Sequence, residues 1–158
     1  MTIPPSVRVL AATAAVAVGA LGLAACGSSG GSDASDRDIG VKLTEWSITT
    51  DRAEAPAGKI TFDMENDGSV VHEFVVVKTD LEPEQIPVDE DGMFDERAKG
   101  LDFLDEVENI DPDGGTAELT MNLKPGKYLL VCNKPPVPKE NLPAHWAEKM
   151  YTHFTVTG

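Results

Sequence analysis

The sequence GKYLLVCNKPPVPKENLPAHWAEKMYTHFTV, residues 126–156, decides the fold. It begins at a glycine turn and runs straight into apolar residues, which predicts a β-strand ending at Cys132. Side chains in a strand alternate between its two faces. The thiol of Cys132 therefore lies with Leu130 on the inner face, while Leu129 and Val131 are expected to face outward.

The last part of the same stretch, residues 150–156, predicts a second strand. Met150, Phe154 and Val156 are in phase with one another at the period of two, so we expect them to point into the core. His153 falls on the opposite face. It is therefore predicted to be a solvated side chain without a role in a buried site.

Between these two strands the chain offers one thiol, one imidazole and one thioether in order, from Cys132, His145 and Met150. A second imidazole is available from His72, which begins the strand-like run HEFVVVK of residues 72–78. Two imidazoles, one thiolate and a weak thioether are the donors of a type 1 (blue) copper site. The sequence therefore predicts one copper ion, cycling between Cu(I) and Cu(II).

With these residues in place, the chain from about Val41 onward resembles the cupredoxin family, the plastocyanin and azurin group of electron carriers. The resemblance implies an all-β fold, a Greek-key β-sandwich of about seven strands, with the domain spanning residues 39–158. It also implies that His72, Cys132 and His145 surround the metal and that Met150 is its axial ligand.

Two features depart from the family pattern. Twelve residues separate Cys132 from His145, four of them proline, where relatives have only a few. Prolines restrict the unbound chain, so we expect a stiff loop that still presents His145. Glu73 stands where relatives carry asparagine, and we expect its carboxylate to bond the amide of Asn133, linking the two ligand segments.

Four further runs predict strands, and they are residues 41–48, 58–65, 70–78 and 116–123. In residues 58–65 and 116–123 the apolar residues alternate cleanly, and in residues 70–78 His72, Phe74 and Val76 fall on one face. In the first, Val41 and Leu43 are out of phase with Trp46 and Ile48, which predicts a bulge near Glu45.

Residues 80–113 interrupt the strand pattern with 14 acidic and two basic side chains. Apolar residues recur there at helical spacing, which predicts one or two short helices laid against the sandwich; they are Phe94, Ala98, Leu101, Leu104 and Val107. This acidic insertion is either a solvated cover or a docking surface for a basic partner.

The N-terminal residues 1–25 have the pattern of a signal peptide, with Arg8 before an uncharged apolar run. Leu23-Ala24-Ala25-Cys26 resembles the lipobox of bacterial lipoproteins, which implies acylation of Cys26 (a palmitate-type anchor). Residues 26–38 are then a lipid-anchored flexible linker. We expect the protein outside the cell, on the outer face of the cytoplasmic membrane. The alternative is an N-terminal membrane helix with an incidental cysteine.

Charge and cysteine count restrict the function further. Without residues 1–25 the chain has 12 basic and 27 acidic residues, a net of −15, which excludes nucleic acid as a partner. With Cys26 acylated, Cys132 has no disulfide partner. A lone thiol in an oxidising compartment favours a metal ligand, although a small buried side chain is the simpler alternative.

These observations predict an electron carrier rather than an enzyme, because only His153 is spare for a second copper centre. We expect a monomer that exchanges electrons with a redox partner protein, a cytochrome or an oxidoreductase, through a small apolar patch around His145. Two alternatives stay open, namely an envelope copper carrier or buffer and a metal-free sandwich that serves as an interaction module. Zinc is disfavoured because methionine is a poor zinc ligand.

Overall fold

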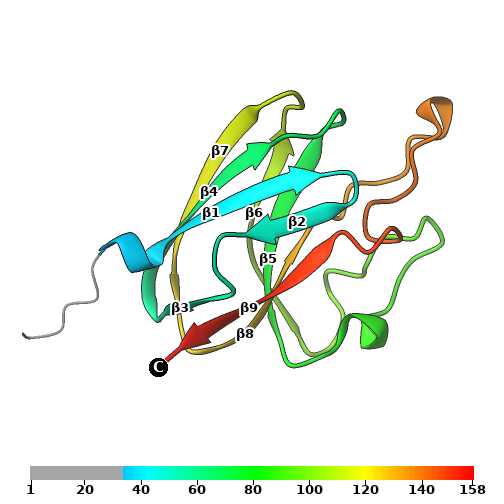
Figure 1. The fold of residues 1–158 in the computed structure, drawn as a ribbon. Coiled ribbons are helices and arrows are strands. Elements are labelled where there is room, and N and C mark those ends of the chain that lie inside the picture. The colour runs from blue at the N-terminus through cyan, green and yellow to red at the C-terminus, as the bar shows by residue number, and fades with distance from the viewer. Residues whose placement is uncertain (1–33) are drawn as a thin grey trace, which may run out of the picture. The chain divides into compact units, whose positions relative to one another are not determined.

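The computed structural model describes residues 34–158, which form two stacked β-sheets (Figure 1). The first sheet has the strand order β2-β1-β4-β7. Its strands are β1 (Asp38–Thr44), β2 (Ser47–Thr50), β4 (Gly58–Asn66) and β7 (Gly115–Leu123). The second sheet has the order β3-β9-β8-β5-β6. Its strands are β3 (Glu54–Pro56), β5 (His72–Thr79), β6 (Leu101–Ile110), β8 (Gly126–Val131) and β9 (Tyr151–Thr157).

The predicted all-β sandwich is confirmed, with nine strands rather than about seven. β1 pairs with β4, and β3 with β9, in parallel, whereas the other pairs are antiparallel. The chain changes sheet five times, between β2 and β3, β3 and β4, β4 and β5, β6 and β7, and β7 and β8. Strands that are distant in sequence therefore lie side by side.

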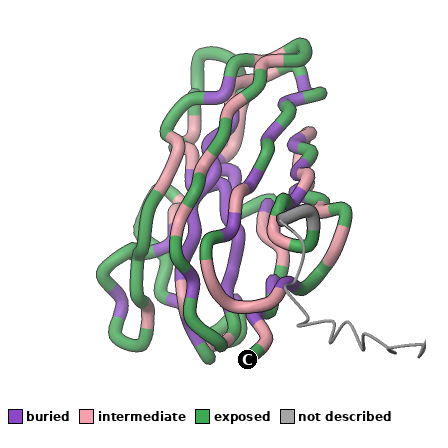
Figure 2. Tube along the Cα trace, turned by 90° about the vertical axis from the view of Figure 1, so that its left-hand side faces the viewer, coloured by how far each residue is buried: buried purple, intermediate pink, exposed green. Residues whose placement is uncertain are grey.

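The core lies between the two sheets, where the buried residues of Figure 2 gather. β4 shows why: its burial alternates, with Ile60, Phe62 and Met64 at 2% exposure or less. Phe62 meets Phe74 and Phe154 of the opposite sheet at ring centroid distances of 5.3 and 5.5 Å. Cys132 belongs to this same core, as its strand phase predicts.

The outer face of the second sheet is also covered by the acidic insertion, which buries residues of β8 that were expected only to face outward. Leu129 and Val131 point away from the sandwich core as predicted, yet each is only 1% exposed. They pack with Ile86 and Phe94 of the acidic insertion and with Trp146. The insertion therefore builds a second, smaller core against the outside of β5 and β8.

The predicted helices in residues 80–113 are wrong. Residues 34–158 contain no α-helix, only three short 3-10 turns, of which Pro83–Gln85 lies in the insertion. Of the residues at helical spacing, Leu101, Leu104 and Val107 lie in the edge strand β6, whereas Phe94 and Ala98 come before it. Two register shifts in the pairing of β6 with β5 interrupt the regular alternation of side chains between the two faces of β6. Its apolar residues therefore occur three and four positions apart in the sequence. Leu104 is consequently 41% exposed.

The predicted bulge in the first strand is also wrong. β1 ends at Thr44, the chain turns through Glu45 and Trp46, and β2 returns antiparallel with Leu43 opposite Ile48. The change of phase in the sequence marks a reversal of the chain. No helix among the described residues is long and apolar enough to span a membrane. The predicted signal peptide, Cys26 and most of the linker lie outside the described residues, and β1 begins at Asp38.

Candidate metal centre

Three neighbouring strands deliver three of the four predicted ligands to one end of the sandwich. His72 is the first residue of β5, Cys132 follows directly after β8, and Met150 directly precedes β9. Because β8 lies between β5 and β9 and runs antiparallel to both, these three strand ends are adjacent. In Figure 1 the long loops also gather at this end, opposite the C-terminus.

The long loop after Cys132 returns His145 by backbone hydrogen bonds. Val137 and Leu142 exchange two of them, at 2.9 and 3.2 Å, so the middle of the loop is a small hairpin. The N–H of His145 then donates to the carbonyl of Lys134 at 3.0 Å. The extra residues therefore form a hairpin whose two ends are hydrogen-bonded to each other. His145 consequently lies close to Cys132 although twelve residues separate them.

The same backbone network includes Met150. Its N–H donates to the carbonyl of His145 at 3.1 Å, and its own carbonyl accepts the N–H of Cys132 at 3.0 Å. Met150 is fully buried. The three ligand segments are thus fixed to one another through main-chain bonds.

The donor atoms of the two histidines and the cysteine converge. Nδ1 of His72 and Nδ1 of His145 are 3.1 Å apart, and Sγ of Cys132 lies 3.1 Å from the second and 3.7 Å from the first. Metal bonds of about 2.0–2.3 Å would place trigonal N and S donors about 3.5–3.8 Å apart. The triangle is slightly tighter than that and fits a single ion.

Burial sets the charge state of these donors. It lowers the pKa of His145 to about 4, with His72 and Lys134 adding to the effect, and it also lowers the pKa of His72. Both imidazoles are therefore neutral at pH 7, the form that binds metal. Burial raises the pKa of the Cys132 thiol to about 12 although the N–H of Glu73 donates to Sγ at 3.3 Å. Metal binding must then release this proton.

The predicted contact between Glu73 and Asn133 exists, but through a different group. Oε1 of Glu73 accepts the backbone N–H of Asn133 at 2.6 Å, not the side-chain amide. The side chain of Asn133 instead accepts the N–H of Phe94 at 2.9 Å and donates to its carbonyl at 3.2 Å. Asn133 therefore ties the acidic insertion to the metal centre.

Two residues beside the donors were missed because they come from the turn between β1 and β2. Trp46 packs its ring edge against His145 and His72, at centroid distances of 4.7 and 6.4 Å. Glu45 places Oε1 3.6 Å from Nε2 of His72. Burial opposes its charge, but hydrogen bonds from backbone N–H groups outweigh burial and lower its pKa. Nothing in the spacing of the sequence signals either contact.

The surroundings of His145 differ from the expected exposed patch. His145 itself is 3% exposed, and Ala144 and Trp146 are buried. Trp146 turns instead to Phe94 and Tyr151, at 5.0 and 4.8 Å between ring centroids. What stays open beside His145 is a cavity of about 390 Å³. Its lining includes Val70, Pro135, Val137 and Leu142.

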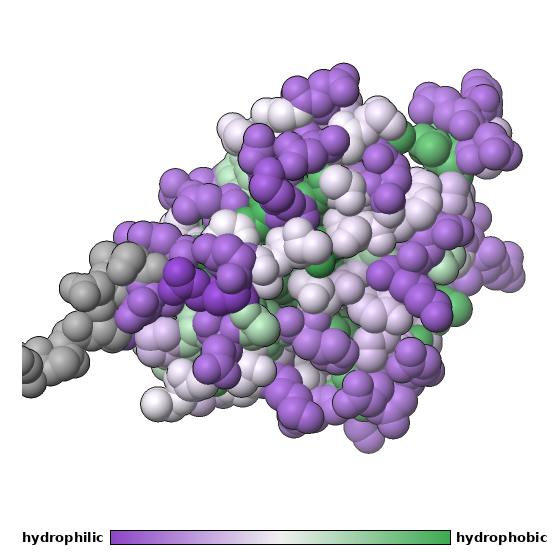
Figure 3. Space-filling model, viewed as in Figure 1, coloured by the Kyte–Doolittle hydropathy of each residue, from purple (hydrophilic) through white to green (hydrophobic). Residues whose placement is uncertain are grey.

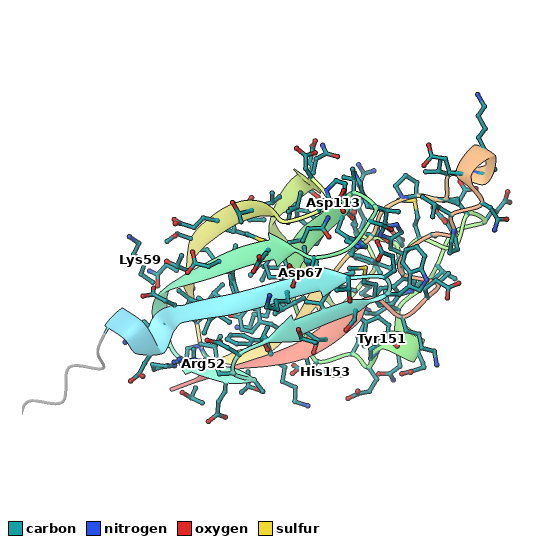
Figure 4. The ribbon with its side chains drawn as sticks, turned by 45° about the horizontal axis from the view of Figure 1, so that its top comes forward. Arg52, Lys59, Asp67, Asp113, Tyr151 and His153 are labelled. Carbon is teal, nitrogen blue, oxygen red and sulfur yellow. The ribbon has the colours of Figure 1, made fainter. Side chains whose placement is uncertain are left out.

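His153 is exposed on β9, as predicted (Figure 4). It takes no part in the donor cluster. Within residues 34–158 the structure contains one group of three or more histidine, cysteine or acidic side chains that could hold a metal ion, and it is His72, Cys132 and His145.

Comparison with known protein families and with curated protein sequences finds no match. Solved structures do match. Auracyanin B is 19% identical, with a TM-score of 0.50 over 77% of this chain and 88% of that one. The fold is cupredoxin-like. A reduced auracyanin from the photosynthetic bacterium Roseiflexus castenholzii is 22% identical with a TM-score of 0.47, over 77% of this chain and 95% of that one. Rusticyanin from Thiobacillus ferrooxidans is 16% identical with a TM-score of 0.44, over 77% and 78%.

The arrangement as a whole is consistent with one type 1 copper. Soft sulfur, two neutral imidazoles and a buried methionine at the adjoining strand end are the donors that such a site requires. Because backbone hydrogen bonds hold the segments in place, the donors need little movement to accept an ion.

Proposed function

We propose that this protein is a one-electron carrier that holds a single copper ion on His72, Cys132, His145 and Met150. The convergence of two Nδ1 atoms and one Sγ within 3.7 Å of one another carries the proposal. When bound, copper supplies the Cu(I)/Cu(II) couple. The protein contributes a fixed set of donors, and a set that moves little between the two states favours rapid electron exchange.

Burial favours the electron carrier over a copper carrier or buffer. His72, Cys132 and Met150 are fully buried and His145 is 3% exposed, so three of the four donors are closed off and only His145 lines an open cavity. The ring of Trp46 also packs beside both histidine rings. A protein that delivers copper would instead need donors near the surface.

The proposed partner is a cationic redox protein, a cytochrome or an oxidoreductase, that docks near the cavity beside His145. Hydrophilic side chains cover most of the face in Figure 3 and hydrophobic ones occur only in small areas, which suits brief contacts. The excess of acidic residues supports attraction of a positively charged partner over distance. The proposal includes a monomer anchored through Cys26 to the outer face of the cytoplasmic membrane.

Titration of the metal-free protein with Cu(II) tests the proposed function. We expect one equivalent to produce an intense visible thiolate-to-copper absorption band and an EPR spectrum with narrow parallel hyperfine splitting. Cys132→Ser should abolish both signals, whereas the matched variant His153→Gln should keep them. A wild-type protein that binds copper without this band would contradict the site, and copper loss to a chelator within seconds would favour the carrier alternative.

A further inference from the structure

One ring nitrogen of His72 faces away from the donor cluster and lacks an ordinary partner. Nε2 is buried and makes no hydrogen bond with any of residues 34–158. Its nearest charged neighbour is Oε1 of Glu45, at 3.6 Å, just beyond hydrogen-bond distance. A buried N–H without a partner costs free energy, so a small approach of these two atoms would be favourable.

The carboxylate of Glu45 is held in this place by the chain segment that leads into β5. Its Oε1 accepts the backbone N–H groups of Ser69 and Val70 at 2.8 and 2.9 Å. Gly68 makes room for it, because a Cβ at that position would lie 2.7 Å from the same oxygen. The turn between β1 and β2 is thus connected to the residues just before His72.

We propose that Glu45 is a positioning residue for the metal centre, and this proposal rests on the copper site proposed above. Its carboxylate keeps the proton of the neutral His72 ring on Nε2. Nδ1, which lies 3.1 Å from Nδ1 of His145, is then free of a proton and available to the metal. The second nitrogen of a metal-binding histidine commonly donates to a carboxylate or carbonyl group, which fixes the ring and makes it a stronger donor.

The charge of Glu45 also has a consequence for the redox couple. A negative group opposite the metal-binding nitrogen increases electron donation from the ring, and the more highly charged Cu(II) gains more from this than Cu(I) does. Glu45 therefore lowers the reduction potential of the centre. Removing the charge should raise it.

Glu45→Gln is the direct test, since the amide oxygen can still accept the N–H groups of Ser69 and Val70. We expect the ratio of Cu(II) to Cu(I) affinity to fall about tenfold, which raises the potential by about 59 mV for one electron. Glu54→Gln is the matched control, because it removes one exposed carboxylate on β3 and should leave the potential almost unchanged. Equal shifts in the two variants would overturn the proposal.

Gly68→Ala tests the same idea without changing any charge. The added Cβ meets the end of a flexible side chain, so the carboxylate should move away while the fold is kept. We expect a rise in potential in the same direction as for Glu45→Gln. A potential equal to that of the wild type would show that the position of the carboxylate does not matter.

A measurement without metal separates this inference from the proposed function. In ¹⁵N NMR spectra of the metal-free protein, His72 should be the Nε2–H tautomer in the wild type and in Glu45→Gln, which keeps the acceptor oxygen, and a mixture of tautomers in Glu45→Ala, which removes it. If the wild-type protein forms no copper band, the proposed function fails, and the tautomer then decides the role of Glu45 alone. An Nδ1–H tautomer in the wild type would contradict that role.

Discussion

Replacing Glu73 by glutamine should change how the stability of the metal-free protein depends on pH. Glu73 is 8% exposed, and burial, opposed by the N–H of Asn133, raises the pKa of its carboxyl from 4.5 to about 7. The folded protein therefore binds this proton more tightly than the unfolded chain does. Since the native state holds more protons between pH 4.5 and 7, the contribution of Glu73 to stability is complete below pH 4.5 and is lost as pH rises through 7.

The size of the effect follows from the two pKa values. At about 1.4 kcal/mol per pH unit, a rise from 4.5 to about 7 corresponds to roughly 3 kcal/mol. The glutamine side chain of the variant resembles the protonated acid and can still accept the N–H of Asn133. We expect wild type and Glu73→Gln to have similar stability at about pH 4, and the variant to be more stable by roughly 3 kcal/mol above about pH 8.

Urea unfolding of both proteins in a chelator, at intervals from about pH 4 to about pH 8.5, measures this difference. Titration of His72, His145 and Cys132 changes the stability of both proteins in the same way. It therefore cancels when the free energy of unfolding of the wild type is subtracted from that of Glu73→Gln at each pH. A difference that stays constant across this range would show that Glu73 is ionised in the folded protein, and the reasoning about its burial would be refuted.

Three other expectations follow from the structure. Asn66→Ala should lower the free energy of unfolding, measured in urea, by roughly 3 kcal/mol. The buried side-chain amide of Asn66 bonds the N–H of Gly68 and the carbonyls of Val70 and Ile110, and its loss leaves those groups without this partner. Asn122→Ala, at an exposed position, is the control and should have little effect. Trp46→Ala should speed copper release to a chelator several-fold, whereas an unchanged rate would show that the ring does not shield the site. Electron transfer to a cationic cytochrome should slow as salt is added, and rates independent of ionic strength would remove the proposed steering.

The sandwich and the donor types could be predicted from sequence because both depend on local patterns. Alternation along β4 and β7 identifies the core face directly, and the period of two along β8 places Cys132 in the same core. Prediction of the metal site also required the order in which histidine, cysteine and methionine occur along the chain. In the structure, His72 and Cys132 are buried at the same end of neighbouring strands, which agrees with the predicted site.

The remaining features depend on contacts between segments distant in sequence. The apolar spacing in β6 resembles that of a helix, and only its pairing with β5, with two register shifts, makes it a strand. Glu45 approaches His72 only because the chain reverses after β1. Leu129 is buried on the outer face because the acidic insertion folds over it, which cannot be read from the strand itself.

The edge strand β6 offers a site for pairing between two copies of the molecule, and its acidic side chains oppose that pairing. Phe103 and Leu104 are 37% and 41% exposed on this strand, beside an unpaired backbone edge that invites another strand. Asp102, Asp105 and Glu108 lie among them, so two copies meeting edge to edge would bring like charges together. Added salt screens this repulsion while leaving the apolar groups in place, and we expect association through this edge to increase with ionic strength while the domain stays folded.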